Sequence, residues 1–569
     1  MHTDIATIDA DLAVLTDHKQ EWAELPISRK IDYLNQIRQL TVDNAQAWAD
    51  VAVEGKGLSP DSTLAGEEWI SGPFPLLRWL EAMSATLTAL DSGTDPLAGI
   101  KIWQRDNGQV AVRAYPTDLV ERLLLDGYTV EVWMDPDVTP GTLRRNMAGF
   151  YRQDNPGGRL VLTLGAGNIS SIVPLDALYK MFGEGAVVIV KMHPVNDYLG
   201  PIFERIFAPL IEAGYLHFDY GGPDTGSYLT GHDAVDAIHL TGSRKTHDTI
   251  VFGPGENGAQ RRARNEPVID KPVTSELGGV GATIIVPGPW SDADYAFQAE
   301  HIATQKLHNG GFNCISAQVV ALASEWDGKD TMMASMRAAL TEAEERPSFY
   351  PGADDRQQRA RDIYPDAEKL EVGVDRTLIG GLDHENTAEY SFREEFFAPV
   401  LSTTEIPGQT PAEFLRNAVR FANETLQGTL AINILVHPDT AKELGPELEQ
   451  AIEDLEFGTI AINAWTGVGF LAARAPWGAY PGHTYEDIES GTGVVHNALL
   501  FDRPQKTVVR APFYPFPRTL RHGQIHLSPR PPWFVSNKTA DVTSKRLTYY
   551  AGDKKLTRLP GVFVSALRG

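Results

Sequence analysis

One cysteine and one glutamate are the residues of this sequence best suited to chemistry on a carbonyl group. Cys314 is the only cysteine among 569 residues, and it follows a glycine-bearing turn at residues 309–313. Glu276 begins a Glu-Leu-Gly-Gly segment at the end of an earlier predicted strand. A thiol can attack a carbonyl carbon, and a carboxylate can be the base that activates the thiol or water. A buried, inert cysteine is the alternative, but the paired glycines before Cys314 allow an exposed turn and favour the nucleophile.

Alternating strands and helices are predicted to position these groups. From residue 159 we expect strands at 160–164, 186–190 and 234–240, with helices at 169–182, 197–213 and 244–252. Buried β-branched strands between amphipathic helices indicate a parallel sheet covered on both faces. Such sheets bind ligands at the carboxyl ends of their strands, which here are followed by residues 165–168, 191–194 and 241–243.

The remaining elements are predicted in the same way. A second unit begins at residue 274, with strands at 282–286, 316–322, 428–436 and 459–463 and helices at 291–307, 331–343, 411–423 and 441–455. Before the first unit we expect helices over 7–55, with Pro26 opening the second, a helix over 73–90, and antiparallel strands at 101–103, 110–115 and 129–133. Seven prolines between residues 504 and 532 predict that residues 503–569 form an extended arm without long helices, ending in a strand at 562–564.

Three strand ends carry candidate binding groups. The glycines at 165 and 167 do not complete a dinucleotide fingerprint, because Ser170 stands where it needs a third glycine, so a tight turn explains them equally well. Asn168 at that turn could donate to a developing oxyanion. Lys191 could bond ribose or phosphate, and Thr241, Gly242 and Ser243 precede a helix whose N-terminus could meet a pyrophosphate.

Two histidines leave another reaction class open. His301 and His308 lie seven residues apart on the helix before the thiol, which is compatible with a Cys–His hydrolase or acyltransferase. Solvated helix positions explain them equally well.

Composition sets the broad class. Hydrophobic residues make up 42% and charged residues 22%, which is ordinary for a soluble protein with two to four domains. We expect a cytoplasmic protein without a membrane span or secretory signal, and a single cysteine excludes an internal disulfide and a cysteine-based zinc site.

The charges that give the net charge of −25 are unevenly distributed along the sequence, because residues 501–569 carry 13 Lys+Arg against 3 Asp+Glu. Because these basic residues are spread among prolines and aromatics, we expect an arm on an acidic body rather than nucleic-acid binding.

Together these motifs resemble the aldehyde dehydrogenase superfamily over about residues 20–500. The segment from Glu276 is similar to the family's general-base motif, and Asn309-x-Gly-x-x-Cys314 to its nucleophile motif. Asn168 and Lys191, 23 residues apart, match the family's oxyanion asparagine and ribose-binding lysine. The segment 394–400 resembles the ribose-clamping segment, and residues 457–463 and 476–478 resemble two further signatures.

The resemblance implies a fold, cofactors and a site. It implies an α/β fold of two parallel-sheet domains, a Rossmann-like cofactor domain and a catalytic domain, with strands 101–134 as an antiparallel oligomerisation element. The implied divisions are residues 1–273 (N-terminal helices and cofactor domain), 274–465 (catalytic thiol domain), 466–502 (return to the cofactor and oligomerisation region) and 503–569 (basic arm). The implied site comprises the catalytic residues Cys314, Glu276 and Asn168 and the cofactor-binding residues Lys191, Thr241, Gly242, Ser243, Glu395 and Phe397, without a metal.

The implied reaction is NAD- or NADP-dependent oxidation of an aldehyde to an acid in a homodimer or homotetramer. Cys314 would carry the acyl group as a thioester, and Glu276 would activate water to release it.

Several positions depart from the family's pattern. The segment Ala166–Ser170 stands where the family has Pro-Trp-Asn-Phe-Pro, Phe312 stands where it has a glutamine, and Pro194 stands where many NAD-using members have a second ribose carboxylate. About ten additional residues lie between residues 241 and 276. The alternatives are a CoA-dependent acylating reductase of the same superfamily, against which Glu276 argues, and a non-redox or catalytically silent protein.

Overall fold

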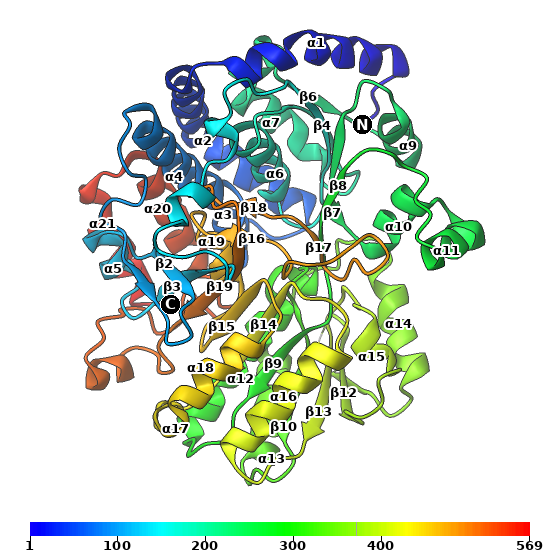
Figure 1. Cartoon of the computed structure of the whole chain (residues 1–569). Coiled ribbons are helices and arrows are strands. Elements are labelled where there is room, and N and C mark those ends of the chain that lie inside the picture. The colour runs from blue at the N-terminus through cyan, green and yellow to red at the C-terminus, as the bar shows by residue number, and fades with distance from the viewer. Residues whose placement is uncertain (371–372) are drawn as a thin grey trace.

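Two large sheets organise the chain, for which the computed structural model describes residues 1–370 and 373–569 (Figure 1). The first has six strands in the order β17-β8-β7-β4-β5-β6, and the second has eleven in the order β1-β2-β3-β19-β15-β14-β9-β10-β13-β12-β11. A pair, β16 (Pro476–Trp477) and β18 (Val495–His496), lies between them (Figure 1).

The six-stranded sheet brings the predicted strand ends into one row. Its members are β4 (Leu160–Leu164), β5 (Val187–Lys191), β6 (Leu216–Asp219), β7 (Ala237–Gly242), β8 (Val273–Leu277) and β17 (Gly491–Thr492). All are parallel except β17, and β4 and β5 are buried along their whole length, as expected for β-branched strands covered on both faces. Thr241 pairs with Glu276, and Leu164 pairs with both Leu240 and Lys191. The general-base candidate and the ribose-lysine candidate therefore lie on the same carboxyl edge.

The eleven-stranded sheet carries the thiol turn at the start of β10. Its members are β1 (Ile102–Gln104), β2 (Val110–Tyr115), β3 (Thr129–Met134), β9 (Gly281–Ile285), β10 (Ala317–Ala323), β11 (Glu368–Leu370), β12 (Arg376–Leu382), β13 (Val400–Ile406), β14 (Ala431–Leu435), β15 (Thr459–Ile462) and β19 (Pro504–Arg510). Within the row β19-β15-β14-β9-β10-β13-β12 each strand is parallel to the next, whereas β3 pairs with β19 in antiparallel register. The predicted oligomerisation strands therefore pair with the sheet of their own chain.

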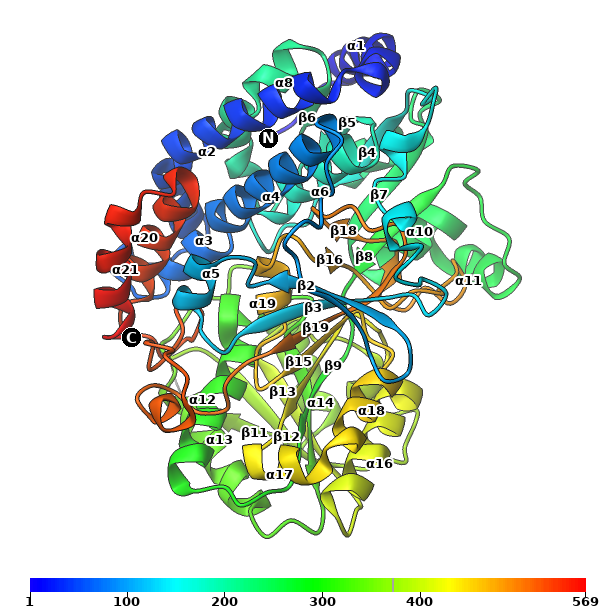
Figure 2. The same cartoon turned by 60° about the vertical axis from the view of Figure 1, so that its left-hand side comes forward.

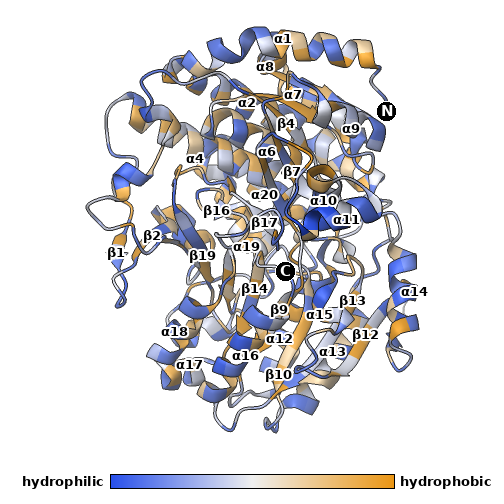
Figure 3. Ribbon diagram, turned by 45° about the vertical axis from the view of Figure 1, so that its right-hand side comes forward, coloured by the Kyte–Doolittle hydropathy of each residue, from blue (hydrophilic) through white to orange (hydrophobic). Residues whose placement is uncertain are grey.

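Helices cover both sheets. Those of the first half are α1 (Ile5–Glu24), α2 (Ile27–Gly55), α3 (Ala65–Ile70), α4 (Pro73–Asp91), α5 (Leu119–Leu124), α6 (Ile172–Leu178), α7 (Gly200–Ile206), α8 (Ala208–Glu212), α9 (Pro223–Gly231), α10 (Arg244–Phe252) and α11 (Gly255–Ala263). Those of the second half are α12 (Asp292–Leu307), α13 (Lys329–Glu342), α14 (Ala353–Ile363), α15 (Tyr390–Arg393), α16 (Pro411–Thr425), α17 (Pro438–Leu444), α18 (Pro446–Asp454), α19 (Gly467–Leu471), α20 (Ala540–Asp553) and α21 (Leu559–Ala566). Figure 3 shows the hydrophobic strand β10 beneath helices with mixed polar and apolar surfaces, as burial of one helix face requires.

The C-terminal segment differs most from expectation. Residues 504–510 form an internal strand, and the predicted strand at 562–564 is wrong, because these residues lie in helix α21. The prolines that argued against helices precede Ala540, and Pro560 occupies the first turn of α21, where it leaves no backbone hydrogen bond unmade. In Figure 2 helices α20 and α21 lie beside α3, α4 and α5.

No helix among the described residues is long and apolar enough to span a membrane.

Candidate active site

The thiol lies on a turn that requires left-handed backbone. Helix α12 begins with a capping box of Ser291 and Asp294 and ends at Leu307. Asn309 then has φ 56° and Gly310 has φ 69°, and these residues reverse the chain before Cys314. Cys314 is partly exposed, as a nucleophile that meets a substrate must be.

The Cys314 thiol and the Glu276 carboxylate face each other. Burial and a neighbouring Asp176 raise the pKa of Glu276 to about 7, and the nearby Cys314 thiol and the Trp477 indole N–H lower it in part. Burial, and after it the charges of the nearby Glu276 and Glu395, raise the pKa of Cys314 well above its usual value. The resting thiol is therefore protonated, and Glu276, which titrates near neutrality, is its nearest base.

Trp477 orients the base, a role that sequence reasoning did not assign to it. Its Nε1 donates to Glu276 Oε2 at 3.1 Å, and its ring packs against Phe470 with a centroid separation of 5.3 Å. The signature at 476–478 drew attention to this segment, but only the fold brings it to β8.

The Asn168 side chain reaches the thiol turn. Its Nδ2 donates to the carbonyl of Phe312 at 2.9 Å, and its side chain is buried. Asn309 connects the two turns, because its Nδ2 donates to the carbonyls of Asn168 at 3.0 Å and Phe312 at 3.2 Å. Asn168, Glu276 and Cys314 thus belong to one constellation.

A buried ion cluster, which sequence reasoning missed, holds Asn309 from the other side. Lys56 Nζ lies 2.9 Å from Glu68 Oε2 and donates to Asn309 Oδ1 at 3.0 Å, and Arg346 donates to the same oxygen at 3.1 Å. Arg346 also pairs with Glu67 and Glu68, and Glu67 Oε2 accepts from the backbone N–H of Asn309 at 3.0 Å. Adjacent glutamates in a short apolar helix, α3, were the signal available in the sequence.

The predicted ribose ligand lies against the base motif. Glu395 is half-buried, and a Cβ at Gly278 would meet its Oε2 at 2.2 Å, so the carboxylate lies directly against this glycine. Burial raises the pKa of Glu395 to about 8 despite the opposing charges of Lys306 and Arg356. Its Oε1 has no hydrogen-bond partner among the described residues, which leaves an acceptor available for a ligand hydroxyl.

A cleft of about 1050 Å³ joins Glu395 to the start of α10. Ser243 is the N-cap of α10 and accepts from the amide of Thr246 at 3.2 Å, so the free amides of this helix terminus face the cleft. The inserted segment forms α11, and its Arg262 and Arg264 also line the cleft. These groups fit a dinucleotide: a helix N-terminus for phosphate and a carboxylate for ribose.

The remaining predicted cofactor-binding residues, Lys191, Thr241, Gly242 and Phe397, differ in burial and in the groups that they contact. Lys191 ends β5 in a buried position that lowers its pKa, although Asp197 opposes this. The Thr241 hydroxyl donates to Asp176 Oδ2 at 2.7 Å, and Gly242 is exposed beside it. The Phe397 ring packs against Tyr350 at 4.8 Å and Phe312 at 5.9 Å.

The two histidines are used in packing. His301 stacks on Phe534 at 5.2 Å, and His308 contacts Trp465 at 4.6 Å and the Asn313 amide at 3.2 Å. No cluster of three or more His, Cys, Asp or Glu in the described part of the chain is arranged to hold a metal ion.

Solved structures with the same fold include several dehydrogenases. A glyceraldehyde-3-phosphate dehydrogenase from Methanocaldococcus jannaschii, complexed with NADP, aligns with a TM-score of 0.59 at 15% identity over 90% of this chain and 95% of that one. A Mycobacterium tuberculosis aldehyde dehydrogenase complexed with NAD⁺ aligns with a TM-score of 0.58 at 16% identity over 89% and 90%. The fold is therefore the α/β fold of aldehyde dehydrogenases, as predicted.

Sequence relatives agree with that class. Residues 141–348 match the model of the aldehyde dehydrogenase family. An aldehyde dehydrogenase from Enchytraeus buchholzi is 25% identical over 299 residues, and a D-glyceraldehyde dehydrogenase (NADP(+)) from Thermoplasma acidophilum is 25% identical over 308. These matches cover 50% and 49% of this chain and 54% and 55% of the relatives, so the chain spans about half the length of the curated relatives it matches. The chain is therefore similar to aldehyde dehydrogenases in residues 141–348 and in its fold.

Proposed function

We propose that this protein oxidises an aldehyde to a carboxylic acid with NAD or NADP. The proximity of the Cys314 thiol to the buried Glu276 carboxyl group, shown by the effect of each on the pKa of the other, carries the proposal, because it places a nucleophile beside a base that titrates near neutrality. The match of residues 141–348 to the aldehyde dehydrogenase family model and the dinucleotides in structures with the same fold support the same reaction.

The first half of the reaction forms an acyl-enzyme. The Cys314 thiol releases its proton to solvent, and Sγ of the resulting thiolate bonds to the aldehyde carbon. The Asn168 amide, turned from its present acceptor at Phe312, and the backbone amide of Cys314 stabilise the oxyanion. Bound NAD or NADP would supply the acceptor for the hydride that leaves this carbon. The acyl group then remains on Sγ as a thioester.

The second half releases the acid. Glu276 removes a proton from water, the water oxygen bonds to the acyl carbon, and the carbon–sulfur bond breaks to regenerate the thiol. Trp477 holds one carboxylate oxygen in place for this step. A base so placed supports water, rather than CoA, as the acyl acceptor.

We assign the cofactor to the cleft between Ser243 and Glu395. The N-terminus of α10 would hold the pyrophosphate, with Thr241, Gly242 and Ser243 at its start, and Lys191 and Glu395 would hold the ribose hydroxyls. Phe397 would limit movement of the nicotinamide. The basic residues of α11 and the absence of an acidic residue at Pro194 are compatible with NADP as well as NAD.

We also propose that the protein is a homodimer or homotetramer. Strand β1 is the outermost strand of the large sheet and presents an unpaired edge. Light scattering of the full chain tests this, and a monomer at micromolar concentration would contradict it.

A panel of aldehydes with NAD or NADP, with and without CoA, tests the reaction by the absorbance of reduced nicotinamide. We expect CoA-independent formation in the native protein and none in Cys314→Ala. A strict requirement for CoA would favour the acylating alternative.

A further inference from the structure

A buried carboxylate that the proposed reaction does not use lies beside the base. Asp176, on α6, is only 1% exposed. Its Oδ2 accepts from the Thr241 hydroxyl at 2.7 Å, and Thr241 on β7 is the residue that pairs with Glu276 on β8. Paired residues of adjacent strands point to the same face of a sheet. After burial, the charge of Asp176 is the next cause that raises the pKa of Glu276, so the two carboxyl groups are neighbours.

His239 continues this row of side chains toward the surface. It precedes Thr241 by two residues on β7, which places both side chains on the same face of the sheet. Its Nε2 lies 3.5 Å from Asp176 Oδ2, and its Nδ1 lies 3.0 Å from Oγ1 of Thr274, its partner on β8. His239 is buried, whereas Thr274 is half-buried. A chain of polar groups therefore leads from the side of Glu276 to the edge of the sheet.

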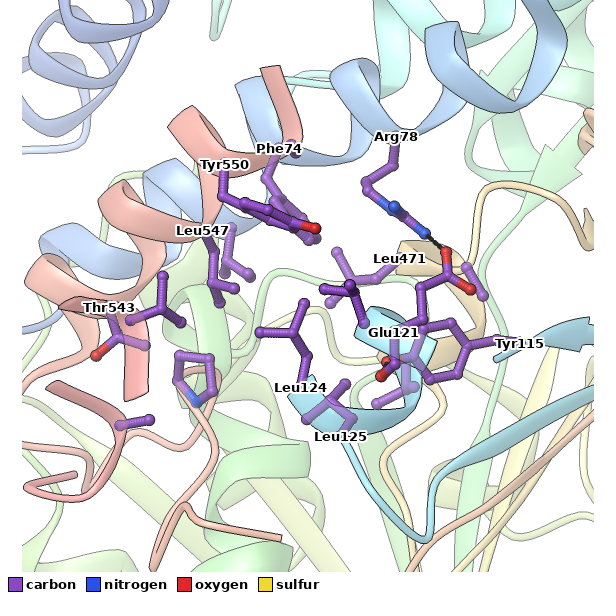
Figure 4. Close-up of a pocket in the computed structure, with 18 of the residues that line it drawn as sticks. Phe74, Arg78, Tyr115, Glu121, Leu124, Leu125, Leu471, Thr543, Leu547 and Tyr550 are labelled. Carbon is purple, nitrogen blue, oxygen red and sulfur yellow. Dashed lines mark hydrogen bonds and ion pairs between the residues drawn. The ribbon is translucent and has the colours of Figure 1, made fainter. Parts of the chain in front are cut away.

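The charges around Asp176 leave it able to take up a proton. Glu121, another buried carboxylate, pairs with Arg474 at 2.7 Å and with Arg78, and Figure 4 shows the second pair beside an apolar pocket. Burial alone would raise the pKa of Glu121, but the two arginines hold it below its usual range. Among the described residues, the ion-pair partner of Asp176 is His239, which can itself gain and lose a proton.

Three unpaired polar atoms mark the start of the chain. Glu276 Oε1, Asp176 Oδ1 and His496 Nδ1 are buried and have no hydrogen-bond partner among the described residues. The His496 ring stacks on Trp477 at 6.3 Å, and Trp477 holds the other oxygen of Glu276. Burial lowers the pKa of His496 to about 4, and the charge of Asp176 opposes this. A buried water typically bonds about three such atoms, so a water can connect Glu276 to Asp176.

A base in this position needs an exit for its proton. Glu276 is 3% exposed, and in each turnover it takes a proton from water that it must lose before it can activate the next water. Trp477 offers it an N–H, which is a donor without an acceptor. Cys314 carries the acyl group at that stage. Of the described groups that act on the pKa of Glu276, Asp176 is the one left to accept the proton.

We propose that Asp176, His239 and Thr274 form a relay that carries the proton from Glu276 to solvent in each turnover. The inference rests on the proposed function, because Glu276 must act as the base of deacylation. The proton passes from Glu276 through a water to Asp176 and then to His239 Nε2. His239 releases its Nδ1 proton to the Thr274 hydroxyl, which gives its own proton to solvent. One proton enters and one leaves, and the reverse exchange of imidazole tautomers resets the relay.

The test measures the hydrolysis of para-nitrophenyl acetate, because an ester acylates a thiol without a dinucleotide. Sγ of Cys314 bonds to the ester carbon and para-nitrophenolate leaves, so the rapid first release reports acylation and the steady release reports deacylation. The variants are His239→Ala, which leaves space for an imidazole, and Asp176→Asn, which keeps an acceptor for Thr241. The control is His217→Ala, whose imidazole pairs with Asp11 at 3.2 Å on β6, the far edge strand of the same sheet.

Both relay variants should slow deacylation alone. In weak buffer the steady release should be at least about tenfold slower than in the native protein, with the first release unchanged, because proton transfer by a positioned group contributes about 100-fold or more. Added imidazole should restore most of the rate in His239→Ala and leave the native protein and His217→Ala unchanged. In Asp176→Asn the acidic limb of the pH–rate profile should also move to lower pH, because a charge that raises the pKa of Glu276 is lost.

The outcomes separate the relay from the proposed function. A native steady rate in either variant, or a loss in His239→Ala that imidazole does not reduce, would overturn the relay. Asp176→Asn preserves the size of the side chain and decides the matter should His239→Ala not fold. If aldehydes are not oxidised but ester hydrolysis shows these effects, the reaction assignment fails and the relay stands. If neither aldehyde nor ester acylates Cys314, both fail.

Discussion

The side-chain amide of Asn309 donates to the backbone carbonyl of Asn168, with 3.0 Å between Nδ2 and the oxygen. This bond joins the turn that carries the proposed nucleophile, Cys314, to the turn that carries the proposed oxyanion donor, Asn168. The same side chain accepts from Lys56 and Arg346, so the two turns are tied to a buried ion cluster. The relative position of the reacting groups therefore depends on Asn309.

Asn309→Ala should lower kcat about 100-fold, because a displacement of the thiol by ~1 Å is enough for such a loss. The KM for the dinucleotide should change little, since the cofactor cleft is elsewhere. Asn417→Ala removes a comparable bond, to the carbonyl of Pro407, at the surface and serves as the control. Steady-state kinetics decide, and unchanged kcat in Asn309→Ala would contradict the positioning role.

The ion cluster should also matter for stability. Lys56→Met leaves Glu68 with one positive partner fewer in a buried site, and removal of one member of a buried ion pair costs about 3–5 kcal/mol. Lys329→Met breaks an exposed pair with Glu405 and should cost no more than about 1 kcal/mol. Urea unfolding of both variants measures the loss of unfolding free energy. Equal losses in the two variants would contradict a larger contribution of the buried cluster to stability.

Replacement of the base should separate the two halves of the reaction. Glu276→Gln retains an acceptor for Trp477 but cannot take a proton from water. Stopped-flow absorbance should show a first turnover of reduced nicotinamide followed by turnover at least about 100-fold slower than in the native protein. Loss of the first turnover along with the steady state would contradict a role confined to deacylation. Glu405→Gln, at the surface, should behave as the native protein.

Activity should depend on pH through Glu276. Its pKa of about 7 means that the carboxyl group is protonated, and inactive as a base, below that pH. The steady-state rate should therefore fall about tenfold per pH unit below 7 and level off above it. A rate that is constant from pH 5 to 9 would exclude this titration as rate-determining.

Trp477→Phe should move this profile. The indole N–H stabilises the charged carboxylate, so its loss should raise the pKa of Glu276 by about one unit, the equivalent of ~1.4 kcal/mol. The acidic limb of the pH–rate profile should shift upward accordingly. Trp326→Phe removes an indole remote from Glu276, whose Nε1 donates to Gly288, and should leave the limb in place.

Strand positions and the site motifs could be predicted from the sequence because they depend on local pattern. The run Val187–Lys191 and the glycines before Cys314 have a local signature. The pairing of Thr241 with Glu276 follows from the parallel order of the strands. Trp477 and Lys56 could not be assigned, because their contacts join residues 201 and 253 positions apart. The C-terminal helices could not be predicted from the number of prolines in the segment, because seven of these prolines lie before α20 begins at Ala540. The division into domains stays a prediction.

The most direct test of the account is intact-protein and peptide mass spectrometry of Glu276→Gln after incubation with an aldehyde from the panel and either dinucleotide. Slow deacylation should leave an acyl group, two hydrogens lighter than the added aldehyde, on the peptide that contains Cys314. The double variant with Cys314→Ala should carry none. Formation of reduced nicotinamide without such an adduct, or with the adduct on another residue, would contradict the claim that Cys314 is the nucleophile.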